Sequence, residues 1–212
     1  MKYKKIGNSD LEASVIGLGS THFGAHNFNN QTESTRIIHK ALDLGINFID
    51  TSPVYGDGNS ETFIKNALKE KGCSYRSKII LSTKAGLEAT TREDGTFGNI
   101  LAPLTKEYLY SSVEKSLKNL GTDYIDLFQL HAFNSETPIE ETMGALDELV
   151  AKGVIRFVGC SNYNPEELKK IWDVCNKYKF EKFVSFQVQY NVIERRAEQE
   201  IVPMCKDLGL TL

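Results

Sequence analysis

The chain has 212 residues, a formal net charge of −3 and a hydrophobic content of 41%. This length suits one domain or at most two, and the weak negative charge does not favour nucleic acid or an anionic membrane surface as a partner. No apolar run approaches the roughly 20 residues that cross a bilayer. The basic N-terminus lacks a following apolar stretch of signal-peptide length. We therefore expect a cytoplasmic protein without membrane insertion.

The four cysteines form no recognisable metal or disulfide pattern. They lie at positions 73, 160, 175 and 205, with no CxxC pair and no cysteine–histidine ligand spacing. This spacing favours reduced thiols in a cytosolic protein over a disulfide framework or a zinc site. We predict no metal site.

The first predicted element in chain order is a β-hairpin, because β-rich segments at 3–6 and 11–14 flank the turn sequence at 7–10. Short apolar runs then predict strands at 15–19, 46–50, 78–83, 124–130, 154–159 and 183–187, and a seventh run begins at Leu210. Helical spacing of apolar residues predicts helices at 32–44, 106–120 and 139–151. Asn164 and Pro165 predict the start of a further helix.

The alternation of strands and helices indicates a parallel sheet with right-handed crossovers. An open doubly wound sheet and a closed barrel both fit this alternation. A doubly wound dinucleotide fold usually carries G-x-G-x-x-G after its first strand, and residues 17–24 do not match it. Polar residues that follow several different strands favour the barrel. We therefore predict an α/β fold, a (β/α)8 TIM-type barrel formed by residues 1–212 as one domain. It is incomplete at the C-terminus, with about six βα units, the start of strand seven and an N-terminal β-hairpin.

Four polar residues stand where predicted strands end. Asp50 ends the second barrel strand, Lys84 the third and His131 the fourth, while Tyr55 lies in the loop after Asp50. Each alone has a structural explanation, such as a buried ion pair, an amphipathic tyrosine or a hydrogen-bonded core histidine. Because the carboxyl ends of barrel strands share one mouth, the four together indicate an active site.

A carboxylate, an ammonium, a phenol and an imidazole suit one kind of chemistry. A free phenol has a pKa of about 10, and a nearby ammonium lowers that value. A carboxylate keeps the ammonium charged and in place, so the phenol can protonate an oxyanion as it forms. A neutral imidazole can donate to the same oxygen. The set contains no nucleophile and no pair of water-activating carboxylates, and it favours carbonyl reduction with a hydride from a cofactor.

Five segments carry a resemblance to a known family. They are LDLGINFIDTSPVYG at 42–56, STK at 82–84, DYIDLFQLH at 123–131, GVIRFVGCSNY at 153–163 and FQVQYN at 186–191. In this order they strongly resemble the signatures of the aldo-keto reductases. The similarity runs from about residue 3 to the last residue.

The resemblance implies an NAD(P)H-dependent oxidoreductase that reduces aldehydes and ketones. It implies that Asp50, Tyr55, Lys84 and His131 are the catalytic tetrad, with Tyr55 as the proton donor. It implies that the cofactor-binding residues are Gly19, Thr21, Asp50, Ser161, Asn162 and Gln187. The last three match positions that hold the nicotinamide carboxamide, an amide that uncharged polar side chains can pair with. The family favours NADPH (NADP+) and leaves NADH open. The expected partner is a small-molecule carbonyl substrate, and an oligomer stays open.

The sequence stops at residue 212, inside its seventh predicted strand, whereas members of the family are roughly half as long again. We expect a fragment of a longer protein. Two alternatives stay open: a cofactor-sensing regulatory subunit similar to the potassium-channel β subunits, which the loop 94–99 resembles, and an inactive truncated remnant. His22, Phe23, Phe97 and Phe133 are candidates to line the substrate pocket.

Overall fold

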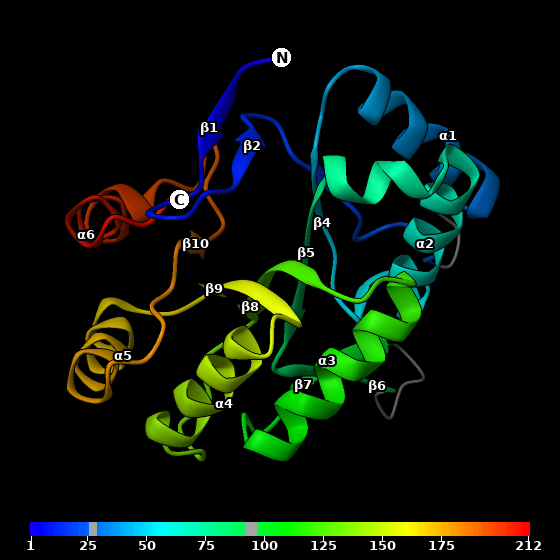
Figure 1. Ribbon diagram of the computed structural model, residues 1–212. Helices are drawn as coiled ribbons and strands as arrows, with labels where there is room; N and C mark the ends of the chain where they lie inside the picture. Colours follow the sequence, from blue (N-terminus) through cyan, green and yellow to red (C-terminus); the bar gives the residue numbers. More distant parts are fainter. Residues whose placement is uncertain (26–28, 92–96) are drawn as a thin grey trace.

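The computed structural model describes residues 1–25, 29–91 and 97–212 (Figure 1). Residues 94–96 of the loop that resembles the channel subunits lie outside this description. The chain begins with the predicted hairpin, in which β1 (Tyr3–Lys5) pairs antiparallel with β2 (Glu12–Ser14). Gly7 in its turn has a φ of +51°, and a Cβ there would lie 2.3 Å from the carbonyl oxygen of Val184. A glycine is therefore required where the hairpin meets the barrel.

Six parallel strands form the main sheet. They are β3 (Leu18–Gly19), β4 (Phe48–Asp50), β5 (Ile80–Ala85), β8 (Ile125–Leu130), β9 (Ile155–Ser161) and β10 (Ser185–Gln187). Their order across the sheet follows the chain from β3 to β10. A parallel bridge between Ser185 and Thr211 adds the start of a seventh strand. This is the architecture of an incomplete (β/α)8 barrel, so the predicted fold class is confirmed.

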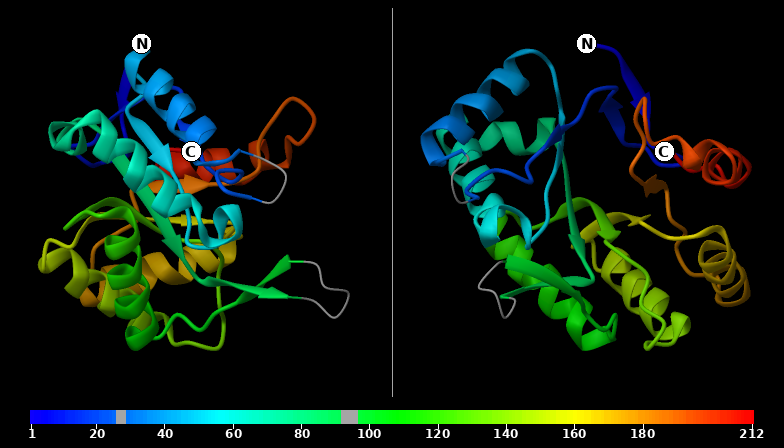
Figure 2. Two further views of the ribbon diagram at one scale, coloured as in Figure 1. Left: turned by 90° about the vertical axis from the view of Figure 1, so that its right-hand side faces the viewer. Right: turned by 180° about the vertical axis from the view of Figure 1, so that it is seen from behind.

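In the described ranges, one helix follows each of the six parallel strands, and the helices lie on the outer side of the sheet (Figure 2). They are α1 (Gln31–Asp43), α2 (Ser60–Lys71), α3 (Lys106–Leu120), α4 (Ile139–Ala151), α5 (Pro165–Tyr178) and α6 (Ile201–Leu208). Asn164 is the N-cap of α5, as predicted, and it forms a capping box: Asn164 accepts from the Glu167 N–H and the Glu167 carboxylate accepts from the Asn164 N–H. Apolar periodicity located α1, α3 and α4, and the cap located the start of α5.

The first barrel strand is shorter than predicted. Only Leu18 and Gly19 pair with β4, while Val15 and Ile16 are 51% and 57% exposed. The Ser14 hydroxyl donates to the carbonyl of Ile16 at 2.7 Å, which bends the chain before the strand begins. The prediction for residues 15–17 was wrong, because an apolar run alone does not fix a strand boundary.

The long connection after β5 contains a second hairpin that the sequence analysis did not predict. Here β6 (Leu87–Thr91) pairs antiparallel with β7 (Phe97–Leu101). Figure 2 shows this hairpin projecting from the body of the protein. Ile100 and Leu101 are both more than half exposed, so no buried face imposed a readable alternation on this segment.

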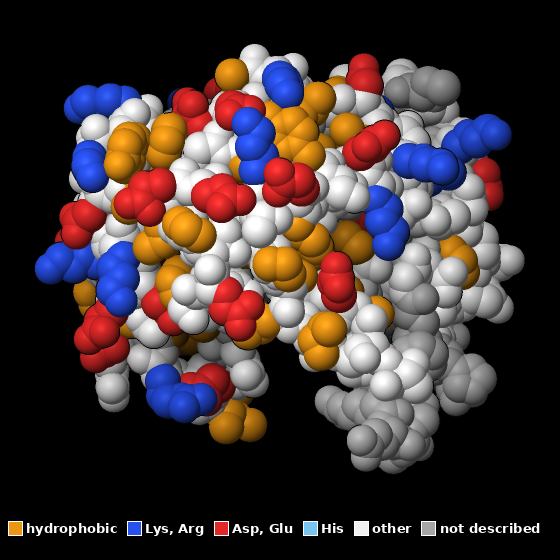
Figure 3. Space-filling view, turned by 90° about the horizontal axis from the view of Figure 1, so that it is seen from below, with side chains coloured by type: hydrophobic (Ala, Val, Ile, Leu, Met, Phe, Trp, Pro, Cys, Tyr) orange, Lys and Arg blue, Asp and Glu red, His pale blue; other side chains and the backbone are white. Residues whose placement is uncertain are grey.

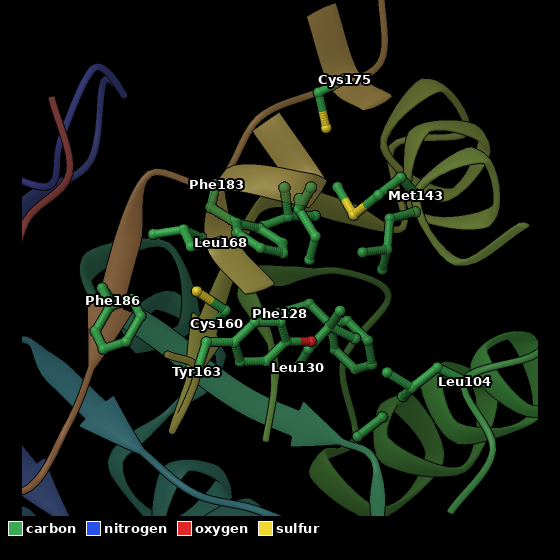
Figure 4. Close-up of a cluster of buried hydrophobic side chains, with 14 of the residues drawn as sticks. Leu104, Phe128, Leu130, Met143, Cys160, Tyr163, Leu168, Cys175, Phe183 and Phe186 are labelled. Atoms are coloured by element: carbon green, nitrogen blue, oxygen red, sulfur yellow. The ribbon is translucent and has the colours of Figure 1, made fainter. Parts of the chain in front are cut away.

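Successive residues of each parallel strand face opposite sides of the sheet. On the outer side, Phe128 and Leu130 of β8 pack with Cys160 of β9 against helices α4 and α5 (Figure 4). Burial raises the pKa of the Cys175 and Cys205 thiols to about 11. These cysteines are unpaired core groups in the described part of the chain.

On the inner side, the first layer of the barrel is apolar. Ile80 of β5 and Leu127 of β8 form one cluster with Ile6, Leu11 and Ala13 of the N-terminal hairpin. The hairpin thus closes the amino-terminal end of the barrel. The polar layers of the interior lie further along the strands, towards their carboxyl ends.

Within the described residues, no helix is long and apolar enough to cross a membrane. The described residues also contain no group of three or more His, Cys, Asp or Glu side chains that could bind a metal ion. The face seen from below Figure 1 carries Lys and Arg interspersed with Asp and Glu (Figure 3). That face therefore shows no large patch of a single charge sign.

Candidate active site

Parallel pairing brings three of the predicted site residues to the same edge of the sheet. Asp50 in β4 lies opposite Ser82 in β5, and Lys84 in β5 lies opposite Gln129 in β8. His131 directly follows the last residue of β8. Because the carboxyl ends of parallel barrel strands meet at one face, the three side chains share the mouth of the barrel.

Lys84 and Asp50 form a buried ion pair in this mouth. Lys84 is 0% exposed, and its Nζ donates to Oδ2 of Asp50 at 2.6 Å and to the carbonyl of Thr51 at 2.9 Å. A buried ammonium needs such partners because it has lost its hydration. The pair therefore fixes a positive charge at a defined point in the barrel.

Tyr55 opens the short 3-10 turn η1 (Tyr55–Gly58) that follows β4. The N–H of Gly56 donates to the carbonyl of Thr21 at 3.0 Å, and Gly56 has a φ of +58°. A Cβ on Gly56 would lie 1.8 Å from the carbonyl oxygen of Phe23, so the turn accepts only glycine there. The turn holds the Tyr55 ring with its centroid 4.8 Å from Nζ of Lys84.

His131 completes the group of four. Its ring meets the Tyr55 ring edge-on, with centroids 5.7 Å apart, and the Ser52 hydroxyl lies 3.4 Å from its Nδ1. Burial, followed by the charge of Lys84, lowers the pKa of His131 to about 4 against the opposing effect of Asp50. The imidazole is therefore neutral at physiological pH. The structure thus brings together all four residues proposed as a tetrad.

Three of the predicted cofactor residues lie at the ends of β9 and β10. Nε2 of Gln187 donates to Oδ2 of Asp50 at 3.3 Å. Ser161 is buried, and Asn162, with a φ of +59°, donates from Nδ2 to the carbonyl of His131 at 3.0 Å. Uncharged amide and hydroxyl groups therefore stand beside the tetrad, as an amide ligand requires.

Apart from Asp50, the remaining predicted cofactor residues are Gly19 and Thr21, at the opposite end of the sheet. Gly19 ends β3 beside Asp50, and a Cβ placed on it would meet no atom within 4 Å. Thr21 is exposed, and its carbonyl accepts the N–H of Gly56 next to Tyr55. The backbone here is open to a ligand that reaches the tetrad.

The sequence analysis missed two residues that contact Asp50. The Ser82 hydroxyl and the Gln129 amide each donate to Oδ1 of Asp50 at 3.2 Å. Ser82 lies two residues before Lys84, and Gln129 lies two residues before His131. Since residues i and i+2 of a strand face the same side, this spacing could have placed both in the site.

Of the residues predicted to line a substrate pocket, Phe23 lies in the core and Phe133 is partly buried against it. Phe23 is buried with the cluster between the sheet and helices α1 and α2, and Phe133 packs on Tyr163. The side chain of Phe97 lies outside the described part of the structure.

Comparison with known proteins identifies the family. The family model described as Aldo/keto reductase family matches residues 15–212. The chain belongs to the aldo/keto reductase family. Aldo-keto reductase YhdN from Bacillus subtilis is 37% identical to it over 213 residues. These matches confirm the resemblance found in the five sequence segments.

Solved structures of the family share the fold. Aldo-keto reductase AKR11C1 from Bacillus halodurans, in its holo form, aligns with a TM-score of 0.82 at 37% identity and covers 99% of this chain. Glycerol dehydrogenase AKR11B4 from Gluconobacter oxydans aligns with a TM-score of 0.84 at 31% identity. The chain spans 64% and 61% of these two structures and 60% of YhdN.

Proposed function

We propose that the protein carrying this chain is an NAD(P)H-dependent oxidoreductase that reduces small aldehydes and ketones to alcohols. The observation that carries the proposal is the buried Lys84–Asp50 pair, whose ammonium lies 4.8 Å from the centre of the Tyr55 ring. A phenol beside a fixed ammonium can give up its proton to an oxyanion, because the ammonium stabilises the negative charge left behind.

The donor set of the site suits a nicotinamide. Ser161, Asn162 and Gln187 offer hydroxyl and amide groups without a net charge, and they match the character of a carboxamide. Gly19 and Thr21 leave the opposite side of the mouth open to the ring. When bound, the reduced cofactor supplies the hydride for the carbonyl carbon.

Each member of the tetrad then has a defined task in the proposal. Tyr55 donates its hydroxyl proton to the carbonyl oxygen as the hydride arrives. Lys84 stabilises the phenolate that remains, and Asp50 holds the ammonium in place. Neutral His131 donates a hydrogen bond to the same carbonyl oxygen and so orients the substrate. NADPH is our preferred cofactor over NADH, on family resemblance.

The proposal is tested by mixing the purified protein with NADPH and a panel of small aldehydes and ketones. We expect the nicotinamide absorbance to fall with carbonyl present and to stay constant without it. Nicotinamide fluorescence should also report binding before any carbonyl is added. Tight NADPH binding with no turnover on the whole panel would contradict carbonyl reduction and favour a cofactor-sensing subunit. Failure to bind either NADPH or NADH would favour an inactive remnant.

A further inference from the structure

The carboxylate of Asp50 is hydrogen-bonded on both of its oxygens. Oδ2 accepts from Lys84 at 2.6 Å and from Gln187 at 3.3 Å. Oδ1 accepts from Ser82 and from Gln129, each at 3.2 Å. The two oxygens therefore accept hydrogen bonds from different residues. The donors to Oδ1, Ser82 and Gln129, are not members of the tetrad.

Gln129 contacts both Oδ1 of Asp50 and the other donor to that oxygen, Ser82. Its Nε2 donates to Oδ1 of Asp50 and, at 2.9 Å, to the hydroxyl of Ser82. Because a primary amide carries two N–H donors in one plane, Gln129 can reach both acceptors at once. Gln129 is 2% exposed and Ser82 is 0% exposed, so water does not compete for these bonds.

The neighbouring strand leaves space for the Gln129 side chain. A Cβ on Gly159 of β9 would lie 3.2 Å from Cγ of Gln129 and 2.2 Å from Oγ of Ser185. The absence of a side chain at Gly159 thus allows Gln129 to lie across the barrel interior and reach Asp50.

The Oδ1 donors differ from Gln187 in one important respect. Gln187 is a proposed nicotinamide contact, so its amide is shared between the carboxylate and the cofactor. Ser82 pairs with Asp50 and Gln129 pairs with Lys84 in register, and both side chains are at most 2% exposed. They can hold Asp50 whether or not a cofactor is present.

We propose that Gln129, together with Ser82, is a positioning residue for carbonyl reduction, and that it acts by holding Oδ1 of Asp50 so that Oδ2 stays turned towards Lys84. This inference rests on the proposed function. The proposal explains why position 129 holds a glutamine. A leucine there has a similar size and would fill the same space, but it would remove one hydrogen-bond donor from the buried Oδ1 of Asp50.

A double-mutant cycle in kcat tests this role. The four proteins are the wild type, Gln129→Leu, Asp50→Asn and the double variant. We expect Gln129→Leu to lower kcat about 10-fold in the wild-type background and less than about 2-fold beside Asp50→Asn. The dissociation constant of NADPH and the KM for the carbonyl should change less than about 2-fold, because Gln129 touches neither in the proposal. An equal loss of kcat in both backgrounds would overturn the inference.

Asn119→Leu is the matched control. Asn119 in α3 donates from Nδ2 to the carboxylate of Glu61 at 3.0 Å. Glu61 is 1% exposed, and this bond lies outside the barrel interior. Its loss removes an amide–carboxylate bond of the same kind, so stability should fall while kcat stays within about 2-fold of wild type. If Gln129→Leu does not fold, Ser82→Ala removes one Oδ1 donor with a smaller change. It should lower kcat only where Asp50 is intact, and a loss that persists beside Asp50→Asn would overturn the inference.

A crystal structure of Gln129→Leu separates this inference from the proposed function. A carboxylate of Asp50 that rotates away from Lys84 supports the positioning role even if the wild type reduces no carbonyl. An unchanged carboxylate in the variant overturns the positioning role even if the wild type is an active reductase.

Discussion

Nζ of Lys84 lies 2.6 Å from Oδ2 of Asp50, and the lysine is completely buried. Both charges have lost most of their hydration, so each depends on the other for its stability in the folded protein. This relationship links the fold to the proposed chemistry, because the pair buried in the barrel interior presents an ammonium to Tyr55.

Removing one member of this pair should cost more stability than removing both. We expect Lys84→Met to lower the free energy of unfolding by about 3–5 kcal/mol, because it leaves the Asp50 carboxylate uncompensated. Adding Asp50→Leu to Lys84→Met should restore part of that loss. Urea unfolding at neutral pH measures both. A double variant less stable than Lys84→Met alone would show that Asp50 is stabilised mainly by its other donors.

The His131 imidazole should titrate near pH 4, well below its ordinary value of 6.5, because burial and Lys84 disfavour the imidazolium. NMR titration of the ring in the folded protein measures this directly. In the unfolded chain the ring binds a proton near 6.5, so the folded state loses stability as pH falls from about 6.5 to about 4, by up to ~3 kcal/mol. His131→Gln should lack this part of the pH dependence. A ring that titrates above pH 6 would contradict the prediction.

Gly56 should be far less tolerant of substitution than Gly58 in the same turn. Both have positive φ, +58° and +85°, so alanine strains either one by about 1 kcal/mol. A Cβ at Gly56 would lie 1.8 Å from the Phe23 carbonyl oxygen, whereas the nearest atom to a Cβ at Gly58 is 3.9 Å away. We expect Gly56→Ala to lower both the melting temperature and kcat, and each decrease should be much larger than the decrease caused by Gly58→Ala. Similar values for the two variants would show that the turn can shift without moving Tyr55.

Tyr163 should be replaceable by phenylalanine without loss of stability. Its hydroxyl is buried without a hydrogen-bond partner in the described part of the chain, so Tyr163→Phe removes an unsatisfied polar group. Thermal unfolding should show an equal or higher melting temperature. Tyr108→Phe is the matched control, since the Tyr108 hydroxyl accepts the N–H of Gly86 at 3.2 Å, and its loss should destabilise. Equal destabilisation by both would indicate that the Tyr163 hydroxyl has a partner.

The parts of the fold that the sequence predicted are those with strong periodicity. The amphipathic helices at 32–44, 106–120 and 139–151 begin within one residue of α1, α3 and α4. The buried strands around Leu127 and Val158 are rich in apolar residues, because both faces of a parallel sheet are covered. The exposed hairpin of β6 and β7 has no such constraint, and its alternation could not be read.

The candidate site was predicted unevenly for a related physical reason. Asp50, Lys84 and His131 follow predicted apolar runs, where a charged or polar residue is conspicuous. Ser82 and Gln129 fall inside those predicted runs, and only the two-residue repeat links them to the site. For Phe23 and Phe133 the sequence offered no such repeat, so the choice between pocket and core depended on loop geometry.

In the proposed reaction, Tyr55 protonates the carbonyl oxygen during hydride transfer. The most direct test is the single-turnover rate of NADPH oxidation in Tyr55→Phe, with Tyr3→Phe, a tyrosine 47% exposed on the hairpin, as control. We expect a rate about 10²–10⁴-fold lower in Tyr55→Phe, with NADPH binding within about 2-fold of wild type. A Tyr55→Phe rate equal to that of Tyr3→Phe would exclude Tyr55 as the proton donor.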